Sequence, residues 1–208
     1  SSLTASETAK VMENTYRAVN IAFIDEWTRY AEVVGIDLYE VIEAIRVRST
    51  HSNIRVPGLG VGGYCLTKDP AFAPSAARQL FGIDNLNFPF SQLAMNVNQK
   101  MPTHAFDRLN EMLGGSCLGK TVLVLGVCYR QDISDTRYSP VEILVRTLEE
   151  KGANVVGYDP YISYWQEMER PLLQNYPDPN TFDAIAITTA HQEFHSLDLL
   201  DWLNDARP

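Results

Sequence analysis

The sequence predicts an all-α domain followed by an α/β doubly wound domain. Residues 6–34 contain no Gly or Pro and repeat apolar residues at helical spacing, whereas short apolar runs typical of buried parallel strands begin only after Gly114. The chain has 208 residues, 45% of them hydrophobic, so it can bury a sizeable core. The change of pattern favours two domains, residues 1–113 and 114–208.

The helical half begins with one long helix. Its apolar pattern runs from residue 6 to residue 34, and Gly35 supplies a C-terminal stop. Asp37 then predicts the N-cap of a second helix, and Glu40 completes an approximate capping box. This second helix is expected to end at about Arg48.

Two more helices follow a glycine-rich loop. The first is predicted from near Pro70 to Phe81 and ends at Gly82. The second is predicted over residues 88–113, with a bend at Pro102 because proline cannot donate the helical hydrogen bond.

The second half alternates strands with a helix. Strands are predicted over residues 120–127, 154–160 and 182–188, with a helix over residues 140–151 between the first two. This order implies a parallel sheet with right-handed crossovers. Ligands in such sheets bind at the carboxyl ends of the strands, so residues 126–137 form a candidate site. No GxGxxG motif occurs there, and a dinucleotide fingerprint is not claimed.

Charged side chains gather in this loop. Arg130 and Arg137 flank Asp132 and Asp135, and an arginine fork suits phosphate oxygens. The alternative is a solvated turn whose charges pair with one another.

Cys65 marks a second candidate site. Four glycines within residues 58–63 precede it, and glycine allows φ > 0 and close approach of a ligand to the backbone. Asp69 follows four residues later. A nucleophilic thiol needs nearby donors or cations such as Lys68. The alternative is that Cys65 is a small buried hydrophobic residue in a tight turn.

The long helix brings two more polar groups together. Lys10 and Asn14 lie four residues apart and share a face that Arg17 nearly joins. This face could point into a site, or it could be an ordinary surface face.

Composition excludes several classes of protein. The net charge of −9 argues against nonspecific nucleic-acid binding, and no apolar run is as long as a membrane span of about 20 residues. The N-terminus does not resemble a signal peptide. Cys65, Cys117 and Cys128 lack the paired spacing of zinc sites or disulfide scaffolds, so we predict no metal, a reducing compartment and a cytoplasmic location. Structural roles are expected for Cys117 and Cys128.

Three sequence blocks, residues 9–20, 60–69 and 126–140, resemble the nucleotide-sugar dehydrogenases in the same order. This family includes UDP-glucose 6-dehydrogenase and UDP-N-acetylmannosamine dehydrogenase. The resemblance covers nearly the whole chain. It implies a central domain that forms a homodimer through the long helix, and a Rossmann-like UDP-binding domain. It also implies oxidation of a UDP-sugar's primary alcohol to a carboxylate in two NAD-dependent steps.

The resemblance assigns roles to matching residues. Cys65 would add to the aldehyde to give a thiohemiacetal and then a thioester. Lys10 would steady negative charge on the substrate oxygen, while Asn14 and Asp69 would position or activate water, with Asp69 as general base. Substrate contacts are expected from the glycine loop and from polar side chains elsewhere: Gly62, Gly63, Tyr64, Arg55, Asn98, Arg130 and Arg137. Arg137 is also a candidate cofactor contact.

Family members begin with an NAD-binding domain that carries GxGxxG, whereas this sequence starts at the long helix with no such motif before it. The expectation is therefore a portion of the enzyme, C-terminally truncated and inactive alone, whose NAD is bound mainly by an absent N-terminal domain. The alternative is a UDP-sugar-binding or dimerisation module without catalytic activity. The sequence leaves open which UDP-sugar is used and whether the cofactor is NAD or NADP.

Overall fold

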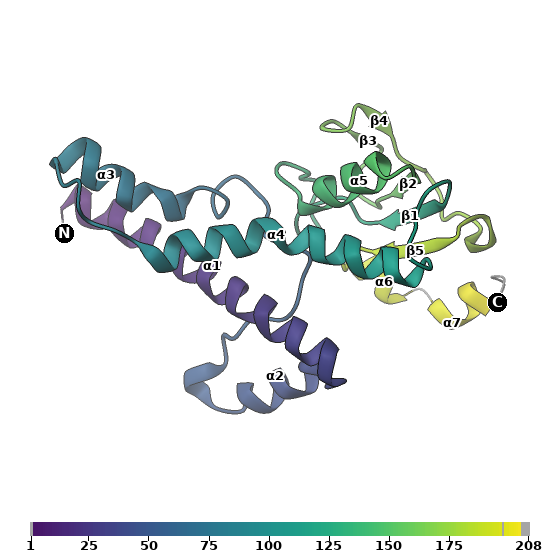
Figure 1. Ribbon diagram of the computed structural model, residues 1–208, viewed down its shortest axis with the longest axis horizontal. Coiled ribbons are helices and arrows are strands. Elements are labelled where there is room, and N and C mark those ends of the chain that lie inside the picture. Colours follow the sequence, from purple (N-terminus) through teal and green to yellow (C-terminus); the bar gives the residue numbers. More distant parts are fainter. Residues whose placement is uncertain (1, 197, 205–208) are drawn as a thin grey trace. The chain divides into compact units, whose positions relative to one another are not determined.

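The computed structural model describes residues 2–196 and 198–204 (Figure 1). The chain forms two compact units, residues 1–101 and 102–208. The first is built from helices and the second around a parallel sheet, which confirms the predicted fold class. A domain boundary after residue 113 stays a prediction. No helix in the described part of the chain carries an apolar stretch long enough to cross a membrane.

Helix α1 spans Leu3–Val34 and begins three residues earlier than predicted. The side chain of Ser2 accepts the N–H of Ala5 and caps the first turn, a signal too short to stand out in the sequence. Gly35 ends the helix in the left-handed conformation (φ 73°), as expected of a C-terminal glycine.

The remaining helices of this unit follow the predicted order. Asp37 caps α2 by accepting the N–H groups of Tyr39 and Glu40, but the helix ends two residues before Arg48. A short 3₁₀ turn replaces the expected first turn of the third helix. The elements are α2 (Leu38–Arg46), η1 (Ser49–His51), η2 (Asp69–Ala71), α3 (Phe72–Phe81) and α4 (Pro89–Met112).

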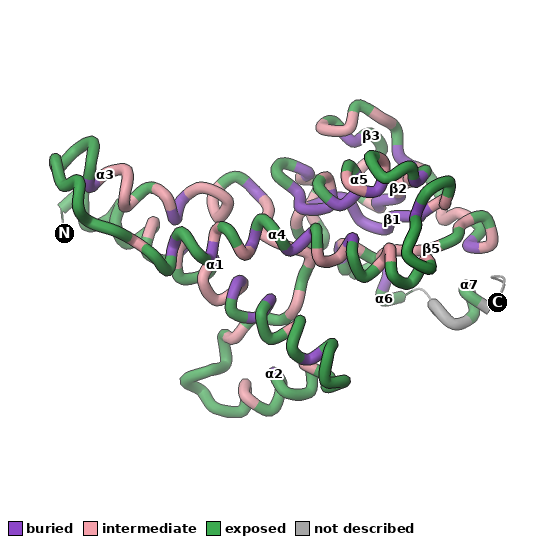
Figure 2. Tube along the Cα trace, viewed as in Figure 1, coloured by how far each residue is buried: buried purple, intermediate pink, exposed green. Residues whose placement is uncertain are grey.

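The long helix has buried and exposed positions along its length (Figure 2), and several of its large apolar side chains are exposed. Ala18, Ala22 and Ala31 are buried, while Phe23 and Trp27 are each 47% exposed. Burying a side chain of that size contributes roughly 1.5–3 kcal/mol, so this unit leaves a substantial apolar surface uncovered.

The second unit is built on β1 (Thr121–Leu125), which lies between β2 (Asn154–Tyr158) and β5 (Ala184–Ile187) in a parallel sheet. Residues 122–125 are fully buried, which explains the uninterrupted apolar run of the central strand. Ser139 caps α5 (Pro140–Glu150), which carries Leu144, Val145 and Leu148 into the core.

Short elements complete this unit, and the sequence patterns did not predict them. They are β3 (Tyr164–Trp165), β4 (Arg170–Pro171), η3 (Pro179–Thr181), α6 (Gln192–Ser196) and α7 (Leu199–Asn204). Because β1, β2 and β5 are parallel, the segments that follow them meet at one edge of the sheet. That edge holds the loop predicted to bind a ligand.

Candidate active site

A buried carboxylate joins the long helix to the cysteine loop. Asp69 is fully buried, and its Oδ2 accepts hydrogen bonds from Lys10 Nζ (2.9 Å) and Asn14 Nδ2 (2.7 Å). The two donors lie one turn apart on α1, so their shared face points into a site and not only toward water. Arg17 instead pairs with Glu13 on the exposed surface.

The backbone between Cys65 and Asp69 forms a tight turn. The carbonyl of Cys65 accepts the N–H groups of Lys68 (3.1 Å) and Asp69 (2.9 Å), and Thr67 Oγ1 donates to the carbonyl of Gly63. Gly63 has φ 79°, a conformation that favours glycine. This turn holds Cys65, which is partly exposed, beside the carboxylate that anchors Lys10.

Lys68 contacts two aromatic rings, one in the same loop and one at the start of α3. Its Nζ is 4.3 Å from the ring centroid of Tyr64 and 4.6 Å from that of Phe72. It also lies 3.6 Å from Oδ1 of Asp69, which accepts no hydrogen bond from the described residues. The contact with Phe72 was not predicted from the sequence.

These contacts set the charge of the cluster. Burial tends to raise the pKa of Asp69, but hydrogen bonds from Lys10 and Asn14 and the charges of Lys10 and Lys68 lower it overall. The hydrogen bond to Asp69 and the charge of that carboxylate raise the pKa of Lys10, and an electrostatic contribution from Cys65 acts in the same direction. The site therefore holds an ionised lysine within electrostatic reach of the thiol.

Replacing Asp69 with alanine should lower the free energy of unfolding at pH 7 by about 2 kcal/mol, because Asn14 loses a charged acceptor. The loss is moderate because the Lys10 side chain is 59% exposed and can be solvated. Since folding lowers the pKa of Asp69 from 3.8, its stabilisation is present above that value and lost as the pH falls through the folded-state pKa. Denaturant unfolding at pH 7 and pH 3 checks both statements.

Glu13→Ala is the control, because it breaks an exposed pair with Arg17 on the same helix and should change stability by less than about 0.5 kcal/mol. Equal stability of Asp69→Ala and the wild type at pH 7 would show that Asp69 does not stabilise the cluster.

The predicted arginines lie in the loop at the carboxyl edge of the sheet. Arg137 makes a bidentate pair with Asp135 (Nε–Oδ1 2.9 Å, Nη2–Oδ2 2.7 Å), which lowers the pKa of that carboxyl. Arg130 is exposed. The Arg137–Asp135 ion pair is of the kind expected for a solvated turn whose charges pair with one another. Arg130 adds an exposed guanidinium to the same loop.

The other predicted contact residues belong to the first unit. Gly62, Gly63 and Tyr64 lie in the Cys65 loop, and Arg55 is exposed in the segment before it. Asn98 is buried and donates to the carbonyl of Ala18 (3.0 Å), which ties α4 to α1. A substrate role for any of these residues stays a prediction.

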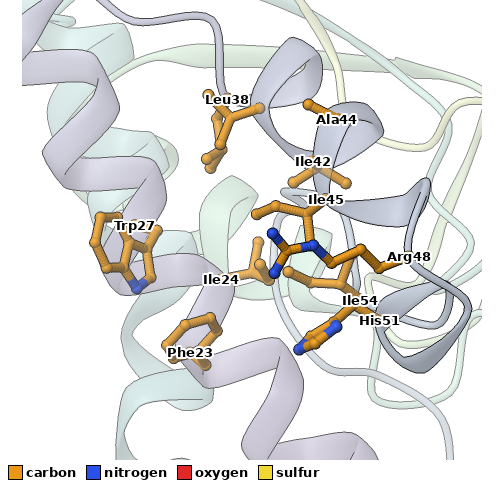
Figure 3. A pocket seen from close by; sticks show the side chains of 11 residues that line it. Phe23, Ile24, Trp27, Leu38, Ile42, Ala44, Ile45, Arg48, His51 and Ile54 are labelled. Carbon is orange, nitrogen blue, oxygen red and sulfur yellow. The ribbon is translucent and has the colours of Figure 1, made fainter.

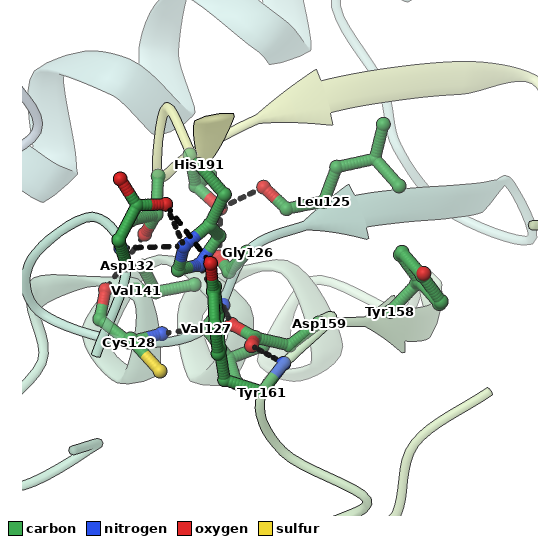
Figure 4. A network of polar contacts seen from close by, with 12 residues as sticks. Leu125, Gly126, Val127, Cys128, Asp132, Val141, Tyr158, Asp159, Tyr161 and His191 are labelled. Carbon is green, nitrogen blue, oxygen red and sulfur yellow. Dashed lines mark hydrogen bonds and ion pairs between the residues drawn. The ribbon is translucent and has the colours of Figure 1, made fainter. Parts of the chain in front are cut away.

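The sheet edge also holds a buried polar network that the sequence interpretation did not identify (Figure 4). Potential ligand atoms of Cys128, Asp159 and His191 lie within 4.8 Å of one another, and all three residues are buried. Burial, followed by the charge of Asp159, raises the pKa of the Cys128 thiol to about 12, so it stays protonated at neutral pH. Hydrogen bonds engage both Asp159 and His191, an arrangement that suits a structural network better than a metal site.

Comparison with known proteins matches both units to one family. Residues 4–100 match the central domain of the UDP-glucose/GDP-mannose dehydrogenase family, and residues 123–207 match its UDP binding domain. UDP-N-acetyl-D-mannosamine dehydrogenases of Pyrococcus horikoshii and Methanocaldococcus jannaschii are 34% and 33% identical over 93% and 97% of this chain. The chain spans 44% of the length of each.

Solved structures agree with this assignment. NDP-N-acetyl-D-galactosaminuronic acid dehydrogenase from Methanosarcina mazei Go1 superposes with a TM-score of 0.87 at 29% identity, covering 99% of this chain and 45% of that one. A UDP-glucose dehydrogenase from Pyrobaculum islandicum gives 0.76 at 29% identity, covering 92% and 44%. Both domain matches, the ordered site residues and the fold lead to one conclusion: this chain belongs to the UDP-glucose/GDP-mannose dehydrogenase family.

Proposed function

We propose that the full-length protein oxidises the C6 alcohol of a UDP-sugar to a carboxylate, and that this chain supplies the reactive thiol and the sugar-nucleotide site. The observation that carries the proposal is the junction of Lys10, Asn14 and Asp69 beside the Cys65 turn. This cluster holds a cation, an amide and a carboxylate next to the turn that carries the thiol, and acyl transfer through a thioester uses groups of these kinds.

In the proposed mechanism, the Cys65 thiolate forms a carbon–sulfur bond with the C6 aldehyde, and the carbonyl oxygen takes up the negative charge. The Lys10 ammonium stabilises that oxygen. A bound NAD would supply the hydride acceptor for both oxidations, of the C6 alcohol to the aldehyde and of the thiohemiacetal to the thioester, while Cys65 holds the carbon through the second. Water then breaks the carbon–sulfur bond, which releases the carboxylate and regenerates the thiol.

Asp69 has two roles in the final step, as a proton acceptor and as the group that positions Lys10 and Asn14. Its lowered pKa makes it a weak base, so it takes up a proton from water less readily than an unperturbed carboxylate. Its bonds to Lys10 and Asn14 nevertheless fix both donors in place. We therefore assign Asp69 chiefly to positioning, with proton acceptance as the second role.

The loop after β1 does not have the form of a usual nicotinamide dinucleotide site. The glycine after β1 leads into a long loop, residues 126–139, instead of directly into a helix N-terminus, and no GxGxxG occurs in it. We place the main NAD contacts outside these 208 residues. Arg137 stays a candidate contact.

Calorimetric titration of the 208-residue chain tests the proposed ligand. UDP, UDP-glucose and UDP-N-acetylmannosamine should bind, and NAD should not. Arg137→Ala should weaken UDP-sugar affinity by at least tenfold, the loss expected for one charge-assisted hydrogen bond to phosphate. Arg108→Ala, which removes an exposed arginine paired with Glu111, is the matched control. Failure of every UDP compound to bind would contradict the proposal.

The same titration addresses the sugar. The relatives are named for N-acetylmannosamine, N-acetylgalactosaminuronic acid and glucose derivatives, so their names support oxidation of a nucleotide sugar and do not select one. The UDP-sugar that binds most tightly identifies the substrate.

A homodimer through the long helix is the second element of the proposal. A groove of about 720 Å³ lies between α1 and α2 and is lined almost wholly by apolar side chains, among them Phe23, Trp27, Ile42 and Ile45 (Figure 3). Phe23, Trp27 and Tyr30 are spaced along one helix surface and contact one another edge-on or tilted. An uncovered apolar surface of this kind is typical of a subunit interface, and a second copy would bury it symmetrically.

Trp27→Glu should convert a dimer into a monomer, because it places a charge within this apolar surface. Sedimentation velocity at matched concentrations measures the change. Leu118→Glu is the control, since Leu118 is an exposed apolar side chain that lies in the other unit. A wild-type chain that is monomeric at high concentration would rule out the dimer.

A further inference from the structure

His191 is a fully buried imidazole that no step of the proposed chemistry uses. The backbone N–H of Asp132 points at its Nδ1 (2.9 Å), so Nδ1 must carry the lone pair. Nε2 lies 3.1 Å from Oδ2 of Asp159 and therefore carries the proton. The two contacts together define a neutral imidazole that accepts on one side and donates on the other (Figure 4).

Asp159 extends this contact to the start of the loop. Its Oδ2 also accepts the N–H groups of Val127 (2.8 Å) and Cys128 (3.3 Å), and its Oδ1 accepts the N–H of Tyr161 (2.9 Å). The Asp159 carboxylate, which directly follows β2, thus holds Val127 and Cys128 in the segment that follows β1.

Asp132 is held from the other side. Its Oδ1 accepts the N–H of Gln192 (2.9 Å) and the hydroxyl of Tyr161 (3.3 Å). Its backbone has φ 57°, a left-handed conformation uncommon for residues other than glycine. Such a conformation persists when surrounding contacts hold it, and the His191 Nδ1 contact acts directly on the backbone of this residue.

The loop that these contacts hold carries both predicted phosphate-binding arginines. Asp132 lies between Arg130 and Arg137 in sequence, and the N–H of Tyr129 donates to the carbonyl of Asp135 (3.2 Å), which closes the loop around Asp132. A change in the backbone at Asp132 therefore shifts the backbone positions from which the side chains of Arg130 and Arg137 extend.

We propose that His191 is a positioning residue that presets this loop for the diphosphate of the sugar nucleotide. The inference rests on the proposed UDP-sugar function. In it, the buried histidine determines the conformation of the loop that carries Arg130 and Arg137. His191 touches no phosphate itself. It acts by holding the Asp132 backbone through Nδ1, while its Nε2 contact fixes the imidazole against Asp159.

Two substitutions distinguish the contribution of the Nδ1 contact from that of the Nε2 contact. In His191→Asn the amide oxygen can take the place of Nδ1 and accept the Asp132 N–H. In His191→Gln the longer side chain reaches toward Asp159 and can replace the Nε2–H donor, but it leaves the Asp132 N–H without an acceptor. UDP affinity, measured by calorimetry on the 208-residue chain, should stay within about threefold of wild type in His191→Asn and fall by at least tenfold in His191→Gln.

Thermal unfolding of both variants is measured alongside. A purely structural histidine would lower the stability of both variants and leave the UDP affinity of their folded forms alike, which would overturn the inference. If the wild type binds no UDP, the proposed function fails and the inference fails with it. Wild-type binding with unchanged affinity in folded His191→Gln removes the inference alone.

Hydrogen exchange on the wild-type chain gives a readout that does not depend on either variant folding. Saturating UDP should slow exchange of the Asp132 amide by at least tenfold, because a ligand that needs the preset loop stabilises its closed hydrogen bond. Unchanged exchange at Asp132 on UDP binding would overturn the inference.

Discussion

Cys65→Ser in the full-length protein should abolish formation of the sugar acid, with turnover falling by about 10³-fold or more. Serine is close in size to cysteine, so the Cys65 turn and the hydrogen bonds to its carbonyl should survive. The chemistry changes because a serine hydroxyl is far harder to ionise than a thiol, and an ester releases its acyl group less readily than a thioester. The measurement is the amount of sugar acid formed per enzyme.

Cys117→Ala is the matched control. Cys117 is buried, and its Sγ makes only long contacts to the carbonyls of Leu148 (4.0 Å) and Lys151 (3.8 Å) in the second unit. Its replacement should leave turnover close to the wild-type value. Normal acid formation by Cys65→Ser would remove Cys65 from the mechanism.

A second comparison distinguishes the roles of Cys65 and Lys10. If Lys10 stabilises charge that develops only during the reaction, its loss should lower kcat and leave substrate affinity little changed. Loss of the thiol should instead stop the conversion of aldehyde to acid. The two residues lie within electrostatic reach of each other, so the variants are compared in the same assay.

Local signals predicted the helices and strands well. Gly35, Asp37 and Gly82 end or begin helices where expected, because left-handed caps and N-caps depend on a few adjacent residues. The i,i+4 spacing of Lys10 and Asn14 likewise placed both on one face, and the structure shows that this face meets Asp69.

Contacts between distant residues were harder to predict. Asp159 and His191 follow different strands, and only the strand order β2-β1-β5 brings both against the loop after β1. A single sequence does not specify that order. In the sequence, the signal that pointed toward this network was that polar residues follow each strand at the carboxyl edge of the sheet. The two-residue strands β3 and β4 escaped prediction because they are too short to show an alternating pattern.

Gly126→Ala should lower the free energy of unfolding by about 2–5 kcal/mol. Gly126 has φ 87°, which costs an L-residue about 1–2 kcal/mol. A Cβ there would also lie 2.6 Å from Cβ, 2.8 Å from the carbonyl oxygen and 3.0 Å from the nitrogen of Thr189. Two of these atoms are backbone, so no rotamer change relieves the contact and overpacking adds about 1–3 kcal/mol.

Gly115→Ala is the matched control, because Gly115 has nearly the same φ (88°) and a Cβ there would meet nothing within 4 Å. Its loss should be confined to the conformational cost, about 1–2 kcal/mol. Denaturant unfolding of both variants therefore separates backbone strain from steric conflict. Equal losses of unfolding free energy in the two variants would show that Thr189 moves away from the new Cβ without destabilising the fold.

The same pair of variants links packing to ligand binding. Thr189 Oγ1 donates to the carbonyl of Cys128 (2.6 Å), so displacing Thr189 disturbs the start of the loop that carries Arg130 and Arg137. Gly126→Ala should consequently weaken UDP binding in whatever fraction remains folded, whereas Gly115→Ala should not. Unchanged affinity in folded Gly126→Ala would mean that the loop keeps its shape without this contact, and its geometry would then depend on Asp159 and His191 alone.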